Sequence, residues 1–429
     1  MARPIHPAGV RKCFPATSML VCLVLAAVLC SLCTGSAWGS AAPRPPKVRA
    51  ITAFVRIERP HYEKQIQQTL AMLRQAKAAF EKGGYEVQTI RITTQPFPQY
   101  IQGMSRPEAL RFFQALDELS RKESFLLSIG PALLKDGDDP AQADLLAEIL
   151  SATELSGSVL VASDDGISWN NIRAAAKVVQ YLENHSAQGG HNFNFAATAL
   201  LEPYAPFFPG SYHTGDGHQF SIGLEGGNFV ADVFAETPGD FVQARQRLAR
   251  ALDEHARALD AIAVQVEKDT GWTYAGLDAT PAPNLDSSIG AAIETLTGTR
   301  FGSSGTLTAA SIITQAVRAI SVKRAGYSGL MLPILEDPRL AQRWGEAAFS
   351  LDALLAYSAV CGTGLDTVAL PGDVSTQQLE RIIGDVASLA FKWHKPLTAR
   401  LIPIPGKKPG EKADAGSSHT TTTTLQPLP

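Results

Sequence analysis

A cysteine, two glycines and an aspartate lie close together in the C-terminal part of the chain: Cys361, Gly362, Gly364 and Asp366. A thiolate can act as a nucleophile or a redox group, and glycine amides beside a carboxylate can contact a ligand. The apolar run 351–361 predicts a helix that ends at the cysteine, and the negative end of a helix dipole disfavours a thiolate. A buried, inert Cys361 is therefore the favoured interpretation, and a catalytic Cys361 is the alternative.

The loop 210–218 gathers two imidazoles and a carboxylate, from His213, Asp216 and His218. Such side chains can hold a metal ion or act as general acid and base. A polar surface loop with neither role explains the same spacing and is favoured. His213 is kept as the catalytic candidate of this loop.

Two further loops combine carboxylates with small polar residues. Asp278 ends a predicted strand, where a carboxylate suits the mouth of a barrel. Asp286 could orient a ligand or, equally well, cap the helix that follows. Ser304, Gly305 and Thr306 lead into a helix whose free amides could hold a carboxylate or a phosphate. This segment lacks both the GK[ST] ending of a P-loop and the GxGxxG turn of a dinucleotide site.

Strands and helices alternate along the chain, and this pattern predicts an α/β fold with parallel strands. Apolar, β-branched runs predict strands over residues 48–57, 86–93, 124–129, 158–162, 192–201, 220–224, 271–277, 327–332, 366–370 and 396–404. Apolar residues at helical spacing predict helices over 61–82, 106–122, 141–151, 170–183, 240–268, 306–322 and 351–361. A last helix is predicted from Ser375, where Gln378 is placed for a capping box.

The composition is that of a globular protein, with 429 residues, 45% hydrophobic and 18% charged residues and a net charge of −3. The chain has no basic region that would suggest a nucleic-acid partner. Four of the five cysteines lie before residue 34, so the rest of the chain can form no internal disulfide.

The N-terminus has the features of a signal peptide over residues 1–41, followed by a linker over 42–47. It combines a positive start, a short apolar run at 19–32 and small residues near 37–41. We therefore expect a secreted or periplasmic protein; an uncleaved leader would instead anchor it in a membrane. Residues 406–429 are polar and threonine-rich, and they predict a disordered tail after a single domain over 48–405.

Several motifs resemble those of the DUF711 family, also called UPF0210, and the resemblance spans residues 48–405. The most specific is CGTGLD at 361–366 with the following TVALP, which is similar to the family's C-x-x-G-L-D, apolar strand and proline. The GYSGL turn at 326–330, the D-x-x-x-A-P and D-S residues at 278–287, and the loop 207–215 are also similar. Where the family has H-G-T-T, this chain has SGTL at 304–307.

The resemblance implies an α/β barrel like that of the pyruvate formate-lyase-like glycyl-radical enzymes, and an uncharacterised activity. The count of about ten alternating strands, with helices outside, independently predicts such a barrel. We expect no glycyl radical, because Gly326 precedes Cys361 and matches an ordinary glycine turn of the family.

Two functions are consistent with these features. The first is an exported, non-radical enzyme that acts on a small molecule at the barrel mouth. Its catalytic candidates are His213, Asp278 and Cys361, and its ligand-binding candidates are Asp286, Ser304, Gly305, Thr306, Gly362, Gly364 and Asp366. The second is an extracytoplasmic protein that binds a small molecule or a metal without catalysis. Any cofactor, any metal and the oligomeric state stay unassigned.

The barrel also predicts where these residues lie. In a parallel barrel the loops that follow the strands share one face. We therefore predict that His213, Asp278, Asp286 and Cys361 converge on one cavity.

Overall fold

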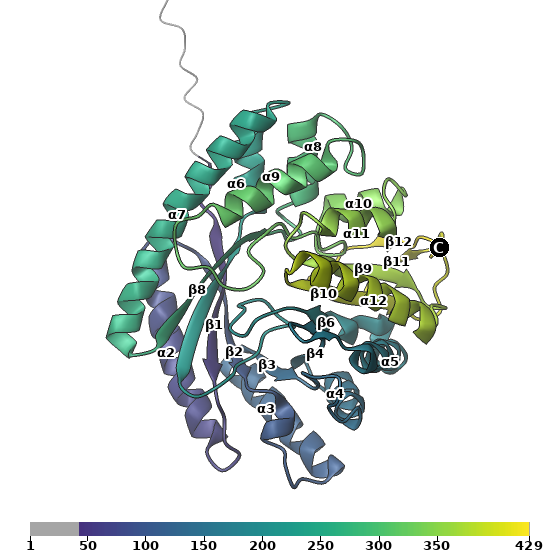
Figure 1. The fold of residues 1–429 in the computed structure, drawn as a ribbon. Coiled ribbons are helices and arrows are strands. Elements are labelled where there is room, and N and C mark those ends of the chain that lie inside the picture. The colour runs from purple at the N-terminus through teal and green to yellow at the C-terminus, as the bar shows by residue number, and fades with distance from the viewer. Residues whose placement is uncertain (1–42, 429) are drawn as a thin grey trace, which may run out of the picture. The chain divides into compact units, whose positions relative to one another are not determined.

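Within residues 43–428, which the computed structural model describes, ten strands form one mixed sheet with helices around it (Figure 1). The first half of the sheet consists of parallel neighbours, in the order β1-β2-β3-β4-β6. These strands are β1 (Lys47–Val55), β2 (Val87–Thr94), β3 (Leu126–Pro131), β4 (Ser156–Ser163) and β6 (Phe195–Ala199). The short β5 (Gly166–Ile167) pairs with β4 in the antiparallel direction.

The second half of the sheet runs in the opposite direction. Its strands are β7 (His218–Glu225), β8 (Thr273–Ala282), β9 (Gly364–Pro371) and β10 (Leu397–Ile404). β7 is parallel to β8 and β9 is parallel to β10, whereas β7 is antiparallel to β1 and β10 is antiparallel to β6. The predicted α/β class, the number of about ten strands and the outer helices are therefore confirmed.

The helices form where capping residues and apolar stripes predict them. Ser375 and Gln378 make the predicted capping box at the start of α12, and Asp240 accepts hydrogen bonds from two backbone amides at the start of α7. The helices are α2 (Tyr62–Lys82), α3 (Arg106–Glu123), α4 (Ala141–Ala152), α5 (Trp169–His185), α6 (Gly227–Ala235), α7 (Phe241–Thr270), α8 (Ile289–Thr297), α9 (Thr306–Arg318), α10 (Pro338–Gly345), α11 (Leu351–Ser358) and α12 (Thr376–Trp393), with 3₁₀ turns at η1 (Phe97–Gln99) and η2 (Ala187–Asn194). The short helices α6 and α10 are missing from the sequence prediction, and α8 was expected only as the helix that follows Asp286.

The segment 324–334 lies between the edge strands β8 and β9 and makes a single parallel bridge to each of them, at Arg324 and at Pro333. The predicted strand at 327–332 is wrong, because the backbone amides there have other partners. The amides of Tyr327 and Ser328 donate to the carboxylate of Asp278 at 2.8 and 3.1 Å, and Ser328 has a positive φ of 47°. A side chain of β8 therefore replaces the ladder of a regular strand.

The C-terminal segment 406–428 is ordered, which corrects the predicted disordered tail. Its strands β11 (Lys412–Ala413) and β12 (Thr423–Thr424) pair with each other, and Leu425 is buried in a cluster with residues of β9 and β10. Thr423 Oγ1 donates to the carbonyl oxygen of Ala341 at 2.6 Å. A few apolar side chains within a polar sequence are enough to fix the segment on the sheet.

The predicted signal peptide, residues 1–41, lies outside the described residues. Among residues 43–428, no helix combines the length and the apolar character needed to cross a membrane.

Both faces of β9 and β10 are covered, and every residue of these two strands is buried. Two of these buried residues, Asp366 and Arg400, carry charges. A buried charge is costly unless it is paired, so these strands indicate where a polar site lies between the halves of the sheet.

Candidate functional site

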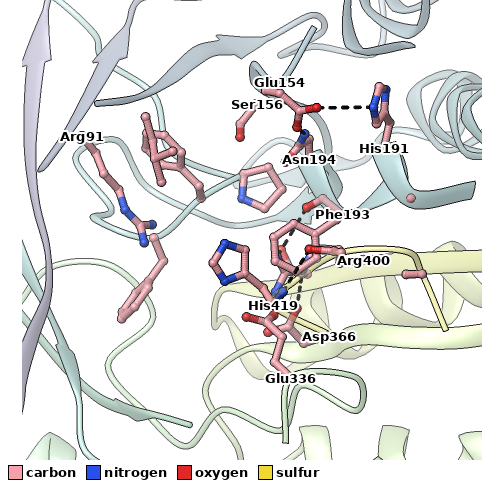
Figure 2. A pocket seen from close by; sticks show the side chains of 18 of the residues that line it. Arg91, Glu154, Ser156, His191, Phe193, Asn194, Glu336, Asp366, Arg400 and His419 are labelled. Carbon is pink, nitrogen blue, oxygen red and sulfur yellow. Dashed lines mark hydrogen bonds and ion pairs between the residues drawn. The ribbon is translucent and has the colours of Figure 1, made fainter. Parts of the chain in front are cut away.

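A cavity of about 510 Å³ lies between the two halves of the sheet (Figure 2). We call it the central cavity; the lining residues used below are Arg91, Phe208, Glu336, Asp366, Arg400 and His419. An adjoining cleft of about 650 Å³ shares Arg49, Arg91 and Glu336 with it and reaches Asp286. Each volume is in the range of pockets that hold small molecules.

Arg91, on β2, is a buried cation that lacks an anionic partner. Its side chain is only 7% exposed, and within residues 43–428 no carboxylate lies within 4 Å of its guanidinium. Nε donates to Thr89 Oγ1 at 3.0 Å, and the guanidinium carbon lies 5.1 Å from the centre of the Phe208 ring. Burial lowers the pKa of Arg91 to about 9. Among residues 43–428 its two terminal nitrogens have no acceptor, so they are free donors at the cavity wall.

A buried network of charged side chains connects Arg49, on β1 beside β2, with the second half of the sheet. Arg49 pairs with Glu225 at 3.5 Å and with Glu336 at 3.1 Å. Arg400 pairs with Glu336 as well, and its Nε donates to Asp366 Oδ1 at 2.7 Å. In this network three carboxylates share two guanidiniums. Burial raises the pKa of Asp366, and the nearby Arg400 opposes that shift.

Aromatic rings cover the network on the side of the C-terminal segment. The guanidinium of Arg400 lies 4.7 Å from the centre of the Phe193 ring, and the exposed His419 stacks on the same ring with the centroids 6.2 Å apart. Figure 2 shows His419 between Arg91 and the group formed by Glu336, Asp366 and Arg400, with Phe193 beside Arg400. The C-terminal segment thus contributes part of the cavity wall.

Of the site residues predicted from the sequence, Asp366 lines the central cavity and the exposed Asp286 lines the adjoining cleft. The residues that line these two spaces do not include His213, Asp278 or Cys361. Ser304, Gly305, Thr306, Gly362 and Gly364 are also absent from both linings.

His213 is buried in the loop between β6 and β7, at the carboxyl end of β2. Its backbone amide donates to Thr94 O at 3.1 Å, and its Nε2 lies 3.0 Å from Gln219 Oε1. Burial lowers the pKa of His213, with hydrogen bonding to Gln219 acting in the opposite direction. Its neighbour His218 stacks on Trp272 at a centroid distance of 4.7 Å. Among residues 43–428, no group of three or more side chains is arranged to hold a metal ion.

Asp278 holds a turn in place. Its carboxylate accepts hydrogen bonds from the side chain and amide of Thr280 and from the amides of Tyr327 and Ser328. Burial raises its pKa to about 6. Gly326 lies so close to this carboxylate that an added Cβ would come within 2.3 Å of Oδ2. These contacts fix the backbone of the segment 324–334, which lies between β8 and β9.

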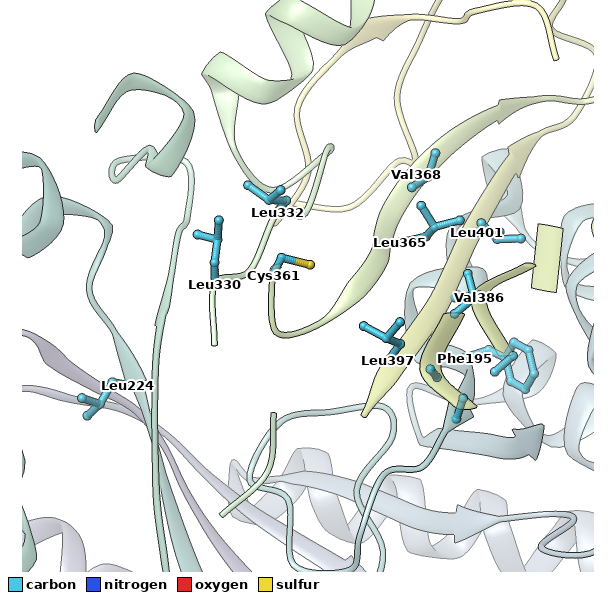
Figure 3. Close-up of a cluster of buried hydrophobic side chains, with 14 of the residues drawn as sticks. Phe195, Leu224, Leu330, Leu332, Cys361, Leu365, Val368, Val386, Leu397 and Leu401 are labelled. Carbon is cyan, nitrogen blue, oxygen red and sulfur yellow. The ribbon is translucent and has the colours of Figure 1, made fainter. Parts of the chain in front are cut away.

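Cys361 is fully buried among apolar side chains (Figure 3). Cys361 belongs to the same apolar cluster as Leu330, Leu332 and Leu365, which is the environment of a structural cysteine. The Nζ atom of Lys395 donates to backbone carbonyls at the end of α11, including that of Cys361. The lysine thus satisfies the carbonyl groups that a helix end leaves without partners.

Most of the other predicted ligand-binding residues take part in local backbone structure. The amide of Gly362 donates to Leu330 O at 2.6 Å, and Gly364 has a φ of 90°. At the start of α9, Thr306 Oγ1 accepts from the Gly302 amide at 3.0 Å. Gly305 has a φ of 101°, and Ser304 is exposed.

Sequence reasoning missed the charged residues that line the central cavity, Arg49, Arg91, Glu336 and Arg400, and Glu225 of the adjoining cleft. A signal was present, because Arg49, Arg91 and Arg400 each interrupt an apolar strand segment. A cation in such a strand must face a polar interior or a partner.

The chain is similar to proteins of several archaea and bacteria. A UPF0210 protein of Pyrobaculum arsenaticum is 32% identical over 361 residues, which cover 80% of this chain and 79% of that protein. A UPF0210 protein of Corynebacterium glutamicum is 25% identical over 376 residues, which cover 83% and 80%.

These relatives correct the prediction of an exported protein. They bear the name UPF0210 protein alone, and neither these names nor the matched family indicates a signal peptide, secretion or a place outside the cytoplasm. The expectation of an uncharacterised activity is consistent with them.

Among solved structures, the chain is similar to the anaerobic ribonucleotide reductase from Thermotoga maritima in complex with dATP and CTP. The TM-score is 0.40 with 9% identity, and the match covers 88% of this chain and 79% of that one.

A family model described as "Uncharacterised ACR (DUF711)" matches residues 43–415. This range contains the whole sheet, the central cavity up to Ala415 and the CGTGLD motif. With the match and the relatives taken together, the chain belongs to the DUF711 family.

Proposed function

We propose that this protein binds a small anionic molecule, with a carboxylate or phosphate group, in the central cavity. The observation that carries the proposal is the buried guanidinium of Arg91, which faces the cavity without a carboxylate partner among residues 43–428. A buried charge without a partner costs free energy, and an anionic ligand would remove that cost. A guanidinium also binds carboxylate and phosphate oxygens with two parallel hydrogen bonds.

The surroundings of Arg91 favour a ligand over an internal ion pair. Hydrogen bonding of Nε to Thr89 and the ring of Phe208 hold the guanidinium in one orientation. The other two arginines that line the cavity, Arg49 and Arg400, are occupied by Glu225, Glu336 and Asp366. Arg91 is thus the preorganised anion-binding group of the cavity.

The test is thermal unfolding in phosphate, citrate and acetate, compared with chloride at equal ionic strength. We expect one or more of the oxyanions to raise the Tm of the unaltered protein, because a ligand that binds only the folded state stabilises it. In Arg91→Gln the increase should disappear. Arg381→Gln, which removes an exposed arginine of α12, is the matched control and should keep it. An equal increase in Arg91→Gln would overturn the proposal.

A further inference from the structure

We infer that the ligand is a zwitterion, whose anionic group pairs with Arg91 and whose ammonium group binds Asp366. This inference rests on the proposed function and adds the second half of the ligand. It is carried by two groups that line the same cavity and that have unused hydrogen-bonding atoms among residues 43–428, the guanidinium of Arg91 and the carboxylate of Asp366.

The acidic surplus lies in the network of Glu225, Arg49, Glu336, Arg400 and Asp366. Both oxygens of Glu336 are in use, one by Arg400 and one by Arg49. Asp366 is different, because Oδ1 accepts from Arg400 Nε at 2.7 Å whereas Oδ2 has no donor within residues 43–428. Asp366 is only 4% exposed and lines the central cavity. It therefore offers one free carboxylate oxygen in a buried position.

The free donors and the free acceptor come from different halves of the sheet. Arg91 is on β2 of the first half, and Asp366 is on β9 of the second half. Figure 2 shows Arg91 on one side of the cavity and Asp366, with Glu336 and Arg400, on the other. A ligand that satisfies both groups must extend across the cavity.

A ligand with one charge leaves half of this arrangement unpaired. A simple carboxylate would pair with Arg91 and leave the acidic surplus, and a simple amine would do the reverse. A zwitterion pairs with both Arg91 and Asp366, and it adds no net charge to the buried region. Phe207, Phe208 and Met331 also line the cavity, and they suit a short hydrocarbon body between the two charged groups.

The experiment measures binding by calorimetry and thermal unfolding for three ω-amino acids: β-alanine, 4-aminobutyrate and 6-aminohexanoate. Each is paired with the carboxylate that lacks the amine, which is propionate, butyrate or hexanoate. We expect one chain length to bind at least about tenfold tighter than its desamino partner, as a charge-assisted contact provides. Equal affinities within all three pairs would overturn the zwitterion and leave anion binding at Arg91 intact.

Variants separate the two halves of the ligand. Asp366→Asn should lose the advantage of the amine and keep the affinity for the plain carboxylate, whereas Arg91→Gln should lose both. Asp373→Asn, an exposed aspartate just after β9, is the matched control and should behave as the unaltered protein. Retention of the amine's advantage in Asp366→Asn would also overturn the inference. If Asp366→Asn does not fold, the paired probes on the unaltered protein decide alone. Absence of binding by every probe would count against the proposed function itself.

Discussion

Arg91 and Arg400 are both buried arginines in strands, but only Arg400 forms ion pairs among residues 43–428. Arg400 pairs with Glu336 and Asp366, whereas Arg91 has a threonine hydroxyl and an aromatic ring as neighbours. The first is part of the framework of the cavity. The second has no ion pair among residues 43–428 and is the group to which the proposed ligand would bind.

This difference predicts unequal effects of the same substitution. Arg400→Met should lower the free energy of unfolding by about 3–5 kcal/mol, because it leaves the buried Asp366 without its cation and Glu336 with only one of its two. Arg91→Met should change it by less than about 1 kcal/mol, since the loss of one hydrogen bond is offset by removal of a buried unpaired charge. Urea unfolding of both variants without ligand measures the contrast. Equal losses would show that Arg91 has a structural role.

The raised pKa of Asp278, which binds backbone amides of the segment 324–334, predicts that the stability of the protein depends on pH. Its pKa is about 6 in the folded protein, above the ordinary value of 3.8. The folded state therefore binds the proton more tightly, so the stability linked to this group is complete below about pH 4 and is lost as the pH rises through 6.

Asp278→Asn should remove this dependence. Between pH 4 and pH 6, the difference in free energy of unfolding should shift in favour of the asparagine variant, by at most about 1.4 kcal/mol per pH unit. Urea unfolding of both proteins across this range is the measurement. A difference that does not change with pH would contradict the raised pKa.

At the scale of elements, the C-terminal segment 406–428 shows how little apolar surface an ordered segment needs. Leu425 is 2% exposed and packs with Leu335 and Ile402. The segment between β11 and β12 then reaches the cavity wall through Ser417 and His419. Its order is thus a condition for the complete cavity.

Leu425→Ala should therefore cost about 2–4 kcal/mol of stability, which is typical for a buried leucine. Thr422→Ala, at an exposed position of the same segment, should change stability by less than about 0.5 kcal/mol. Urea unfolding compares the two variants. A disordered segment would make both substitutions neutral.

For the whole molecule, the opposite directions of the two half-sheets decide where chemistry can occur. In a barrel of uniformly parallel strands, loops at one end form the site. Here Arg91, Asp366 and Arg400 lie within their strands, and the cavity lies between the halves. His213 and Asp286 follow the carboxyl-end rule in their own loops, but antiparallel pairing of β1 with β7 places them at opposite ends of the sheet.

The sequence by itself determined the local features of this protein. The capping box at Ser375, the family motifs and most of the alternating strands and helices depend on neighbouring residues, and these were predicted correctly. The charged residues inside apolar strands were also visible in the sequence, as Arg91 and Arg400 show. Their meaning was not visible, because an arginine with a partner and one without a partner look the same in a sequence.

Tertiary structure alone decided the features that depend on distant residues. The carboxylate of Asp278 accepts hydrogen bonds from the amides of Tyr327 and Ser328, which lie 49 and 50 positions away and would otherwise pair with a neighbouring strand. Glu336 and Arg400, 64 positions apart, become an ion pair only when the segment before α10 meets β10. The cavity, with its unpaired groups on Arg91 and Asp366, arises from such contacts, because the energy of a buried charge depends on which residues the fold places beside it.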